Sequence, residues 1–201
     1  DIAIDVATGK TLTYSGAAVN LGAKTLTLSG GGTLSNTNAL VLNNADSLLS
    51  LDDSSTVGLA SVTVGSNVGK GLAVNESSTI SSLKVTANTE LKVAQGKVLS
   101  GSTEVAAATN LKLSGTGTFG SALNLLGTLE AGANLTVSGL ISVGGNSAVS
   151  IPANTTLTYT GGDLNVGAYS LSIGGAGTFS NATGSPLVLN VADSILDLSS
   201  T

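Results

Sequence analysis

Residues 11–36 read TLTYSGAAVNLGAKTLTLSGGGTLSN, and residues 156–181 read TLTYTGGDLNVGAYSLSIGGAGTFSN. The two segments start 145 residues apart, and fourteen of their 26 aligned positions are identical. A globular domain rarely repeats itself in this way, whereas a solenoid does so freely because each coil contacts only its neighbours. The repeat therefore indicates a stacked, quasi-one-dimensional architecture.

The repeat extends beyond these two segments. Residues 39–51 match residues 186–198 at nine of 13 positions, so that 11–51 corresponds to 156–198 as a whole. A partial third copy lies at 93–125, where LSGTGTF echoes the LSGGGTL and IGGAGTF of the other copies. We expect residues 1–201 to form one continuous solenoid with an internal repeat of about 145 residues.

Apolar and polar residues alternate within the copies, as in KTLTL at 24–28, NLKL at 110–113 and YSLSI at 169–173. A period of two is typical of a strand with one buried and one solvated face. Turn-forming segments such as ATGKT, TANTE and EAGAN separate the apolar positions. We find no segment with a convincing helical period.

These features predict an all-β fold, a parallel β-helix (β-solenoid). Corners recur about every seven residues, so a three-sided coil takes about 20–22 residues, which lies in the range of solenoid repeats. The chain is then long enough for nine to ten coils, and the offset between the two copies corresponds to about seven of them. We expect right-handed coiling, because parallel crossover connections are overwhelmingly right-handed.

Neither end of the sequence resembles the polar or helical cap that solenoids usually carry. The sequence begins with an acidic residue rather than a signal peptide, and it stops inside the second copy. We therefore expect either a slice of a longer array or a subunit that stacks end to end.

The composition excludes several kinds of chemistry. The chain has no His and no Cys, and all seven of its basic residues are Lys. It therefore lacks imidazole and thiol nucleophiles, the usual zinc ligands and bidentate arginine recognition of phosphate. With a net charge of −5, it also lacks the basic field that nucleic-acid binding requires. We expect no cofactor and no metal.

The repeated glycine motifs, together with the corners ANTTLTY (153–159) and VATGKTLTY (6–14), resemble repeat regions of secreted bacterial surface proteins. These are the β-helical passenger domains of autotransporters and the filamentous-haemagglutinin-like adhesins. The resemblance implies export, an extracellular or cell-surface location, and adhesive or fibre-forming roles. It implies no particular functional residue.

Acidic residues are the first candidates for catalytic or metal-binding groups. Asp52 and Asp53 form one acidic pair, but general acid–base catalysis needs two opposed carboxylates, and we expect a solvated corner. Asp46 and Asp193 lie in a repeated ADS triplet, which favours an Asx turn over a calcium site. We therefore predict no catalytic residue and no enzymatic activity.

Other motifs have simple structural interpretations. Residues 65–70 resemble a phosphate loop with the wrong spacing and no following helix, and Gly30–Gly32 is typical of a corner that needs positive φ angles. Lys84, Lys92, Lys97 and Lys112 could form a weak site for anionic glycans, but a solvated face is the simpler interpretation.

Three TLT segments, at 11–13, 25–27 and 156–158, raise the possibility of an ice-binding surface. Such a surface needs threonines once per coil on one flat side, whereas the first two segments lie about two sides apart. We interpret these threonines as β-branched strand residues.

The sequence thus predicts a non-enzymatic, extracellular structural segment of a bacterial surface fibre, sheath or adhesin. Its partners would be copies of itself, further repeats of a longer chain, or surface glycans, with no nucleic acid and no membrane insertion. A glycan-binding or glycan-cleaving β-helix is the first alternative, and an ice-binding or hydration surface is the second.

Overall fold

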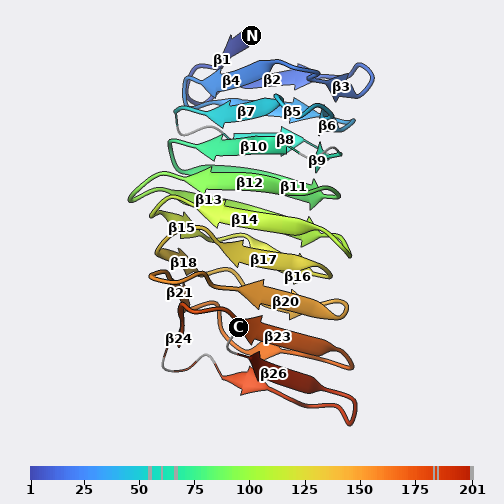
Figure 1. The fold of residues 1–201 in the computed structure, drawn as a ribbon. Helices are drawn as coiled ribbons and strands as arrows, with labels where there is room; N and C mark the ends of the chain where they lie inside the picture. Colours follow the sequence, from blue (N-terminus) through green and yellow to red (C-terminus); the bar gives the residue numbers. More distant parts are fainter. Residues whose placement is uncertain (54–55, 60, 66–67, 183, 185, 200–201) are drawn as a thin grey trace.

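The computed structural model describes residues 1–53, 56–59, 61–65, 68–182, 184 and 186–199. Within them the chain forms an all-β solenoid of parallel strands with about 22 residues per turn and about eight turns (Figure 1). The predicted fold class is confirmed. Each coil has three sides, which we call the first, second and third faces.

The first face is a ten-stranded parallel sheet that runs the length of the molecule. Its strands, in spatial order, are β1 (Ile2–Asp5), β4 (Thr25–Ser29), β7 (Leu48–Leu51), β10 (Val68–Val74), β12 (Thr89–Val93), β14 (Asn110–Ser114), β17 (Thr128–Ala131), β20 (Ser147–Ser150), β23 (Ser170–Gly174) and β26 (Ile195–Ser199).

The second and third faces share one sheet, because β11 and β13 run across the corner between them. The second face consists of β2 (Thr11–Tyr14), β5 (Thr33–Asn36), β8 (Thr56–Leu59), β11 (Ser78–Val85), β13 (Val98–Val105), β15 (Thr118–Phe119), β18 (Leu135–Val137), β21 (Thr156–Tyr159) and β24 (Thr178–Asn181). The third face consists of β3 (Val19–Asn20), β6 (Leu40–Leu42), β9 (Val62–Val64), the second halves of β11 and β13, β16 (Ala122–Leu125), β19 (Ile141–Val143), β22 (Leu164–Asn165) and β25 (Leu187–Val188).

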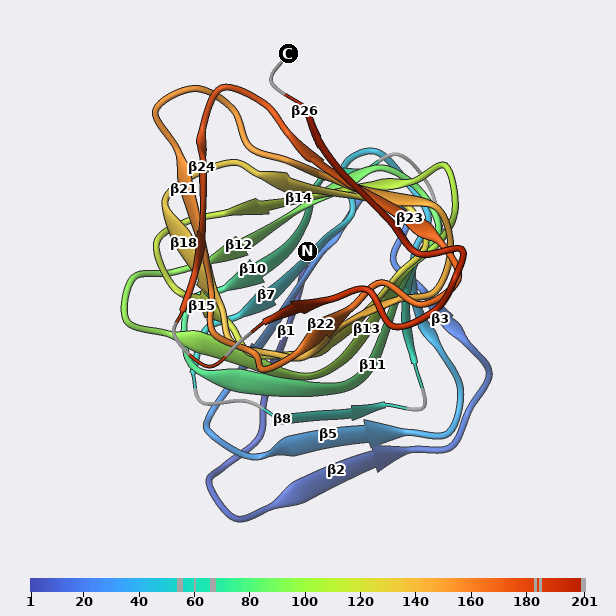
Figure 2. The same cartoon turned by 90° about the horizontal axis from the view of Figure 1, so that it is seen from below.

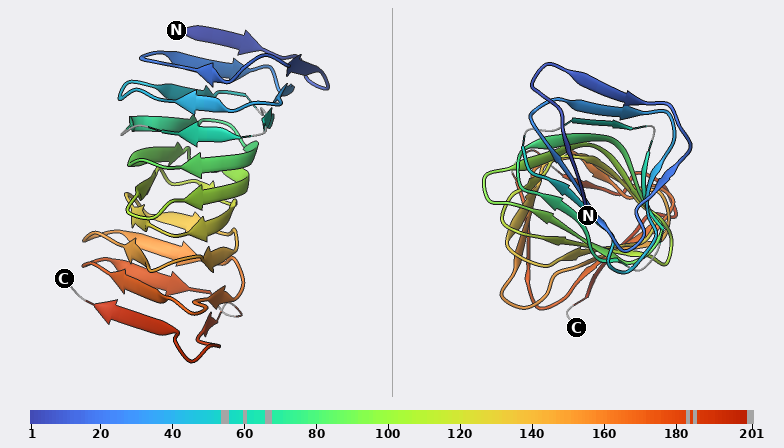
Figure 3. Two further views of the ribbon diagram at one scale, coloured as in Figure 1. Left: turned by 90° about the vertical axis from the view of Figure 1, so that its right-hand side faces the viewer. Right: turned by 90° about the horizontal axis from the view of Figure 1, so that it is seen from above.

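The coils are less uniform than the sequence predicted. On the first face, Asn110 is in register with Thr128, whereas Ser170 is in register with Ile195, so the coil at the C-terminal end is much longer than the one in the middle. The structure has about eight turns, where the sequence predicted nine to ten. Seen from the N-terminal end, the chain runs clockwise as it recedes, so the solenoid is right-handed as predicted (Figure 3).

Inward side chains stack in ladders along the axis. On the first face, register pairs place Leu26, Leu49, Leu72, Leu91 and Leu113 in one column, and each is 4% exposed or less. A buried leucine contributes about 1.5–3 kcal/mol relative to an exposed one. The alternation read from the sequence therefore supplies a continuous apolar core without helices.

The repeated glycine motif stacks on the repeated corner of the preceding coil. Three equivalent hydrogen bonds run from the last glycine of the motif to the carbonyl oxygen that opens the corner: Gly32 to Val6 (2.7 Å), Gly117 to Val93 (3.2 Å) and Gly177 to Ile151 (2.8 Å). A Cβ at Gly117 would collide with the carbonyl oxygen of Ala94. The two motifs recur together because they are the two halves of one contact.

The copies also occupy equivalent places in the solenoid. The two TLTY sequences form β2 and β21, which are separated by seven steps of the second face. In each copy the tyrosine ring lies against the glycine two residues further along the chain, Gly16 or Gly161. A Cβ on that glycine would collide with the ring. The second copy therefore shows the environment that residues of the first copy would have if another coil lay above them.

Some corners place one residue in the left-handed region. In corners that lead into the second face this residue is Gly9 (φ 73°), Gly96 (φ 71°) or Asn154 (φ 62°), and in the corner between β13 and β14 it is Ala108 (φ 56°). In this region a Cβ approaches the backbone, which costs about 1 kcal/mol for alanine relative to glycine.

We expect Ala108→Gly to raise the free energy of unfolding by about 0.5–1 kcal/mol, because glycine relieves the left-handed strain. Gly96→Ala should lower the free energy of unfolding by a similar amount. A Cβ there meets no atom within 4 Å, so the only cost is the left-handed backbone conformation that alanine must adopt. Urea denaturation of both variants measures the two effects. Shifts of the same sign would contradict this explanation.

Candidate functional site

The lysines that suggested an anion-binding face are mostly engaged with glutamates of neighbouring coils. Lys84 Nζ lies 3.2 Å from Glu104 Oε1, and the other two pairs are Lys97 with Glu76 (2.7 Å) and Lys112 with Glu130 (3.7 Å). These partly exposed pairs contribute about 0–1 kcal/mol each. The pairing neutralises much of the positive charge that an anionic glycan would need. The fourth lysine of the group, Lys92, is exposed.

The acidic pair lies at an exposed corner, as predicted. Asp52 Oδ1 accepts hydrogen bonds from Ser50 Oγ and from Asn75 Nδ2, both at 2.6 Å. Asn75 belongs to the next coil, so Asp52 joins two coils. Across the described residues, no group of three or more His, Cys, Asp or Glu could hold a metal ion.

The repeated ADS triplet is explained by its serine. Asn44 Oδ1 accepts the Asp46 N–H (3.1 Å), so the Asx turn belongs to Asn44 and not to Asp46. Ser47 Oγ accepts the Asn44 N–H and donates to the carbonyl oxygen of Gly22 in the preceding coil.

The second copy keeps this arrangement. Ser194 Oγ accepts the Val191 N–H at 3.2 Å and donates to the Gly167 carbonyl oxygen. The residue equivalent to Asn44 is thus a valine, whereas the serine is retained. A hydroxyl that both accepts and donates explains the repeated triplet better than a carboxylate does.

Two glycine-rich segments have different outcomes. Gly30 (φ 90°) and Gly31 (φ 70°) adopt the positive φ angles that the sequence predicted, whereas Gly32 does not. The segment 65–70 that resembles a phosphate loop includes residues 66–67, which lie outside the described residues.

Threonine recurs along the outer side of the second face. Thr11 lies beside Thr33, and Thr118, Thr136 and Thr158 lie beside one another in successive coils. These rows are not evident from the sequence, because most of their members come from motifs other than TLT. Strands β2, β5, β8, β15, β18, β21 and β24 contain no Asp, Glu or Lys.

The threonine face is not flat along its whole length. Strands β2, β5 and β8 lie side by side along one edge of the end-on view, whereas β15, β18, β21 and β24 lie along another (Figure 2). The twist of the sheet accounts for this turn. The uncharged rows therefore form separate panels.

A shallow hollow of about 280 Å³ crosses the third face. It spans four coils and is lined mainly by small polar groups, with Leu140 (46% exposed) at its rim. Its one carboxylate is Glu104, which is paired with Lys84. An acidic groove across three coils would have favoured a glycan-cleaving enzyme. This hollow, with its single carboxylate, is not such a groove.

Thr103 also lines this hollow, in an apolar column between Leu83 and Leu123. It is 3% exposed, and its hydroxyl has no hydrogen-bond partner. A buried unsatisfied hydroxyl costs about 1–3 kcal/mol.

We expect Thr103→Val to raise the free energy of unfolding by about 1 kcal/mol, since a methyl group replaces the unpaired hydroxyl. Thr109→Val is the matched control, because the Thr109 hydroxyl donates to the Ala107 carbonyl oxygen (3.4 Å) and its loss should not stabilise. Thermal unfolding compares the two. A destabilised Thr103→Val variant would show that this hydroxyl is satisfied.

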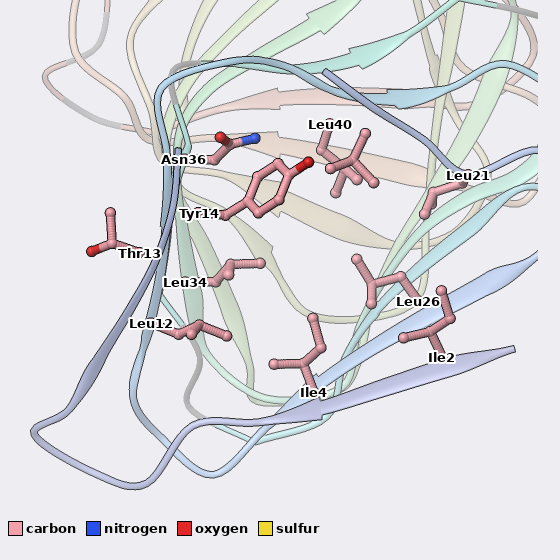
Figure 4. Close-up of a pocket in the computed structure, with 11 residues that line it drawn as sticks. Ile2, Ile4, Leu12, Thr13, Tyr14, Leu21, Leu26, Leu34, Asn36 and Leu40 are labelled. Carbon is pink, nitrogen blue, oxygen red and sulfur yellow. The ribbon is translucent and has the colours of Figure 1, made fainter. Parts of the chain in front are cut away.

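Both ends of the solenoid expose core side chains. At the N-terminal end, Ile2, Leu12 and Tyr14 are 53%, 45% and 42% exposed and border an apolar hollow of about 280 Å³ (Figure 4). At the C-terminal end, Leu198 is 69% exposed beside a hollow of about 340 Å³ that Phe179 also lines.

Tyr159 is the interior counterpart of Tyr14. It is 0% exposed, and its hydroxyl oxygen accepts the Ile141 N–H of the coil above at 3.3 Å. Burial raises the pKa of the Tyr159 phenol, the Ile141 hydrogen bond lowers it, and the negative charge of Asp163 raises it further. The net shift is upward.

This shift predicts a loss of stability in alkali. The folded state favours the neutral phenol, so its contribution is complete below the unfolded pKa of about 10 and is lost as the pH rises towards the folded value. Urea denaturation at pH 8–11 measures the slope, and Tyr159→Phe should reduce it. An unchanged slope in that variant would assign the alkaline sensitivity to other groups.

Comparison of the chain with protein-family models, curated proteins and solved structures finds no match. In the described residues, no helix is long and apolar enough to cross a membrane. Inferences about function therefore rest on the geometry above.

Proposed function

We propose that the chain is a non-enzymatic structural segment of an extracellular bacterial fibre, sheath or adhesin. The observation that carries this proposal is the unbroken ladder of parallel strands on the first face, from β1 to β26. The hydrogen bonds between coils and the apolar column beneath them both run along the axis of the solenoid. Such continuous contacts favour a stiff rod. The nine strand layers of the second face occupy about 43 Å along the axis.

The polar contacts support the same role. The ion pairs of Lys84, Lys97 and Lys112 and the bonds of Ser47 each join neighbouring coils. These side chains hold the stack together and do not converge on a pocket. Function would then lie in length, stiffness and surface, as in the surface proteins that the sequence resembles.

Antibodies raised against the purified chain test the proposed location. They should label the outside of intact source cells without permeabilisation. In parallel, the chain incubated with neutral and acidic polysaccharides should release no reducing ends. Labelling only after permeabilisation, or release of sugar ends, would overturn the proposal.

A second candidate function, an ice-binding or hydration surface, is favoured by the uncharged threonine rows of the second face. Threonine has a restricted χ1 angle, so a row presents ordered hydroxyl and methyl groups to water. Thr136, between Thr118 and Thr158, lies at the centre of one panel.

Inhibition of ice recrystallisation tests this candidate. The native chain should slow crystal growth, and Thr136→Lys should abolish the effect, while Ser172→Lys on the outer side of the first face should not. No inhibition by the native chain would exclude this function.

A further inference from the structure

The chain contains an interior copy of its own N-terminal end. Leu12 and Tyr14 are 45% and 42% exposed, whereas Leu157 and Tyr159, at the same places in an identical TLTY strand, are 0% exposed. The pairs differ in their surroundings because a coil lies above β21, while β2 is the first strand of its face. The interior therefore shows what covers such an end, namely another parallel coil.

The interior junction identifies the contacts that this coil must make. On the second face, Leu135 pairs with Leu157 and Val137 pairs with Tyr159. On the third face, the Ile141 N–H at the start of β19 donates to the Tyr159 hydroxyl. At the N-terminal end, Tyr14 presents the same hydroxyl beside the open hollow (Figure 4).

The C-terminal end presents strands of suitable chemistry. Phe179 on β24 and Leu187 on β25 are only partly buried and lie in the columns of Leu157 and Leu164. Set on β2, strand β24 would bring Phe179 to Leu12 and Asn181 to Tyr14. The chain already contains both kinds of contact, since Leu157 pairs with Phe179 and Tyr159 pairs with Asn181.

The strand count imposes one condition on such a junction. Among the described residues, the first face has ten strands, whereas the second and third faces have nine each. If β24 stacks on β2 and β25 on β3, then β26 of the upper copy and β1 of the lower copy compete for one position above β4.

The two competing strands are chemically equivalent. In β1, Ile2 and Ile4 face inward onto Leu26 and Leu28. In β26, Leu196 and Leu198 occupy the corresponding inward positions, in register with Leu171 and Ile173. Either strand could therefore fill the single position, but both cannot.

We propose that two copies of this chain join head to tail, with the C-terminal strands β24 and β25 of one copy seated on β2 and β3 of the next, and with one strand, β1 or β26, displaced from the shared position above β4. The displaced strand makes assembly of the intact chain slow, because a formed pairing must open first. This inference rests on the proposed structural role, and it supplies the partner as a second copy.

Deletions of the competing strands test the shared position. Four forms of the 201-residue chain are compared by sedimentation velocity and electron microscopy: the intact chain, one lacking residues 1–5, one lacking residues 195–201, and one lacking both segments. Each single deletion should form filaments at least tenfold faster than the intact chain, with an axial repeat of about 43 Å. The double deletion leaves a gap of one strand and should assemble less than either single deletion.

Equal behaviour of the four forms, or assembly strongest in the double deletion, would overturn the proposal. A point variant avoids the risk that a deletion prevents folding. Leu12→Asp charges the N-terminal end and should abolish assembly, whereas Leu140→Asp, at a site that is 46% exposed on the side of the rod, should not. Loss of assembly in both variants, or in neither, would also contradict it.

These results are separable from the proposed function. A chain that stays monomeric in all forms yet labels the cell exterior would refute the head-to-tail junction and leave the structural role intact. If the chain assembles as expected but the antibodies label only the cell interior, the extracellular structural role is refuted and the head-to-tail junction stands.

Discussion

Gly115→Ala should destabilise the solenoid by about 2–5 kcal/mol. Gly115 has a φ angle of 81°, and a Cβ at this position would collide with the carbonyl oxygen of Val93 in the preceding coil. Alanine therefore incurs both the left-handed penalty and a displacement of the stacked corner. Because the solenoid is a one-dimensional stack, we expect the loss to weaken the coils on both sides of the junction.

Gly145→Ala is the matched control. A Cβ there makes ordinary contacts, the nearest at 3.6 Å from Leu126, and the φ angle is not in the left-handed region. Its unfolding free energy should stay within about 1 kcal/mol of the native value. If both variants unfold at the same urea concentration, close corner stacking does not explain the glycine motif.

Leu157→Ala should lower the free energy of unfolding by about 2–5 kcal/mol, whereas Leu12→Ala should lower it by about 1 kcal/mol or less. Both leucines occupy the second position of a TLTY strand. Leu157 is 0% exposed between Leu135 and Phe179, so truncation opens a cavity. Leu12 is 45% exposed at the end of the stack.

Thermal and urea unfolding of the two variants measures this difference at low protein concentration, where copies do not associate. A second measurement at high concentration separates intrinsic stability from assembly. If Leu12→Ala proves as costly as Leu157→Ala at low concentration, the N-terminal end is covered within one chain, contrary to the structure.

Much of the fold could be predicted from local pattern. The alternation in segments such as 24–28 set the strands, and short turn-forming segments set the corners, because a strand's buried face and a corner's positive φ angle depend on a few adjacent residues. The length of each individual coil could not be predicted in this way, because it changes along the stack, as the registers of Asn110 with Thr128 and of Ser170 with Ile195 show.

The candidate surfaces were harder to predict because they form between coils. The Lys84–Glu104 pair and the threonine rows join residues of successive coils, and one residue of error in coil length would misalign them. The role of Ser47 depended on the Gly22 carbonyl oxygen one coil away. Side-chain spacing along the chain carries no information about such neighbours when coil length changes from one step of the stack to the next.

The sequence by itself determined the all-β solenoid, its three-sided coil and the equivalence of its two copies, because period-two alternation and internal repetition are local properties. Only the tertiary structure decided which residues meet across coils and which faces stay uncharged. It also decided that Leu12 and Tyr14 are exposed while Leu157 and Tyr159 are buried. Identical strands receive different environments because burial is set by the coil above, and sequence within a strand does not specify that neighbour.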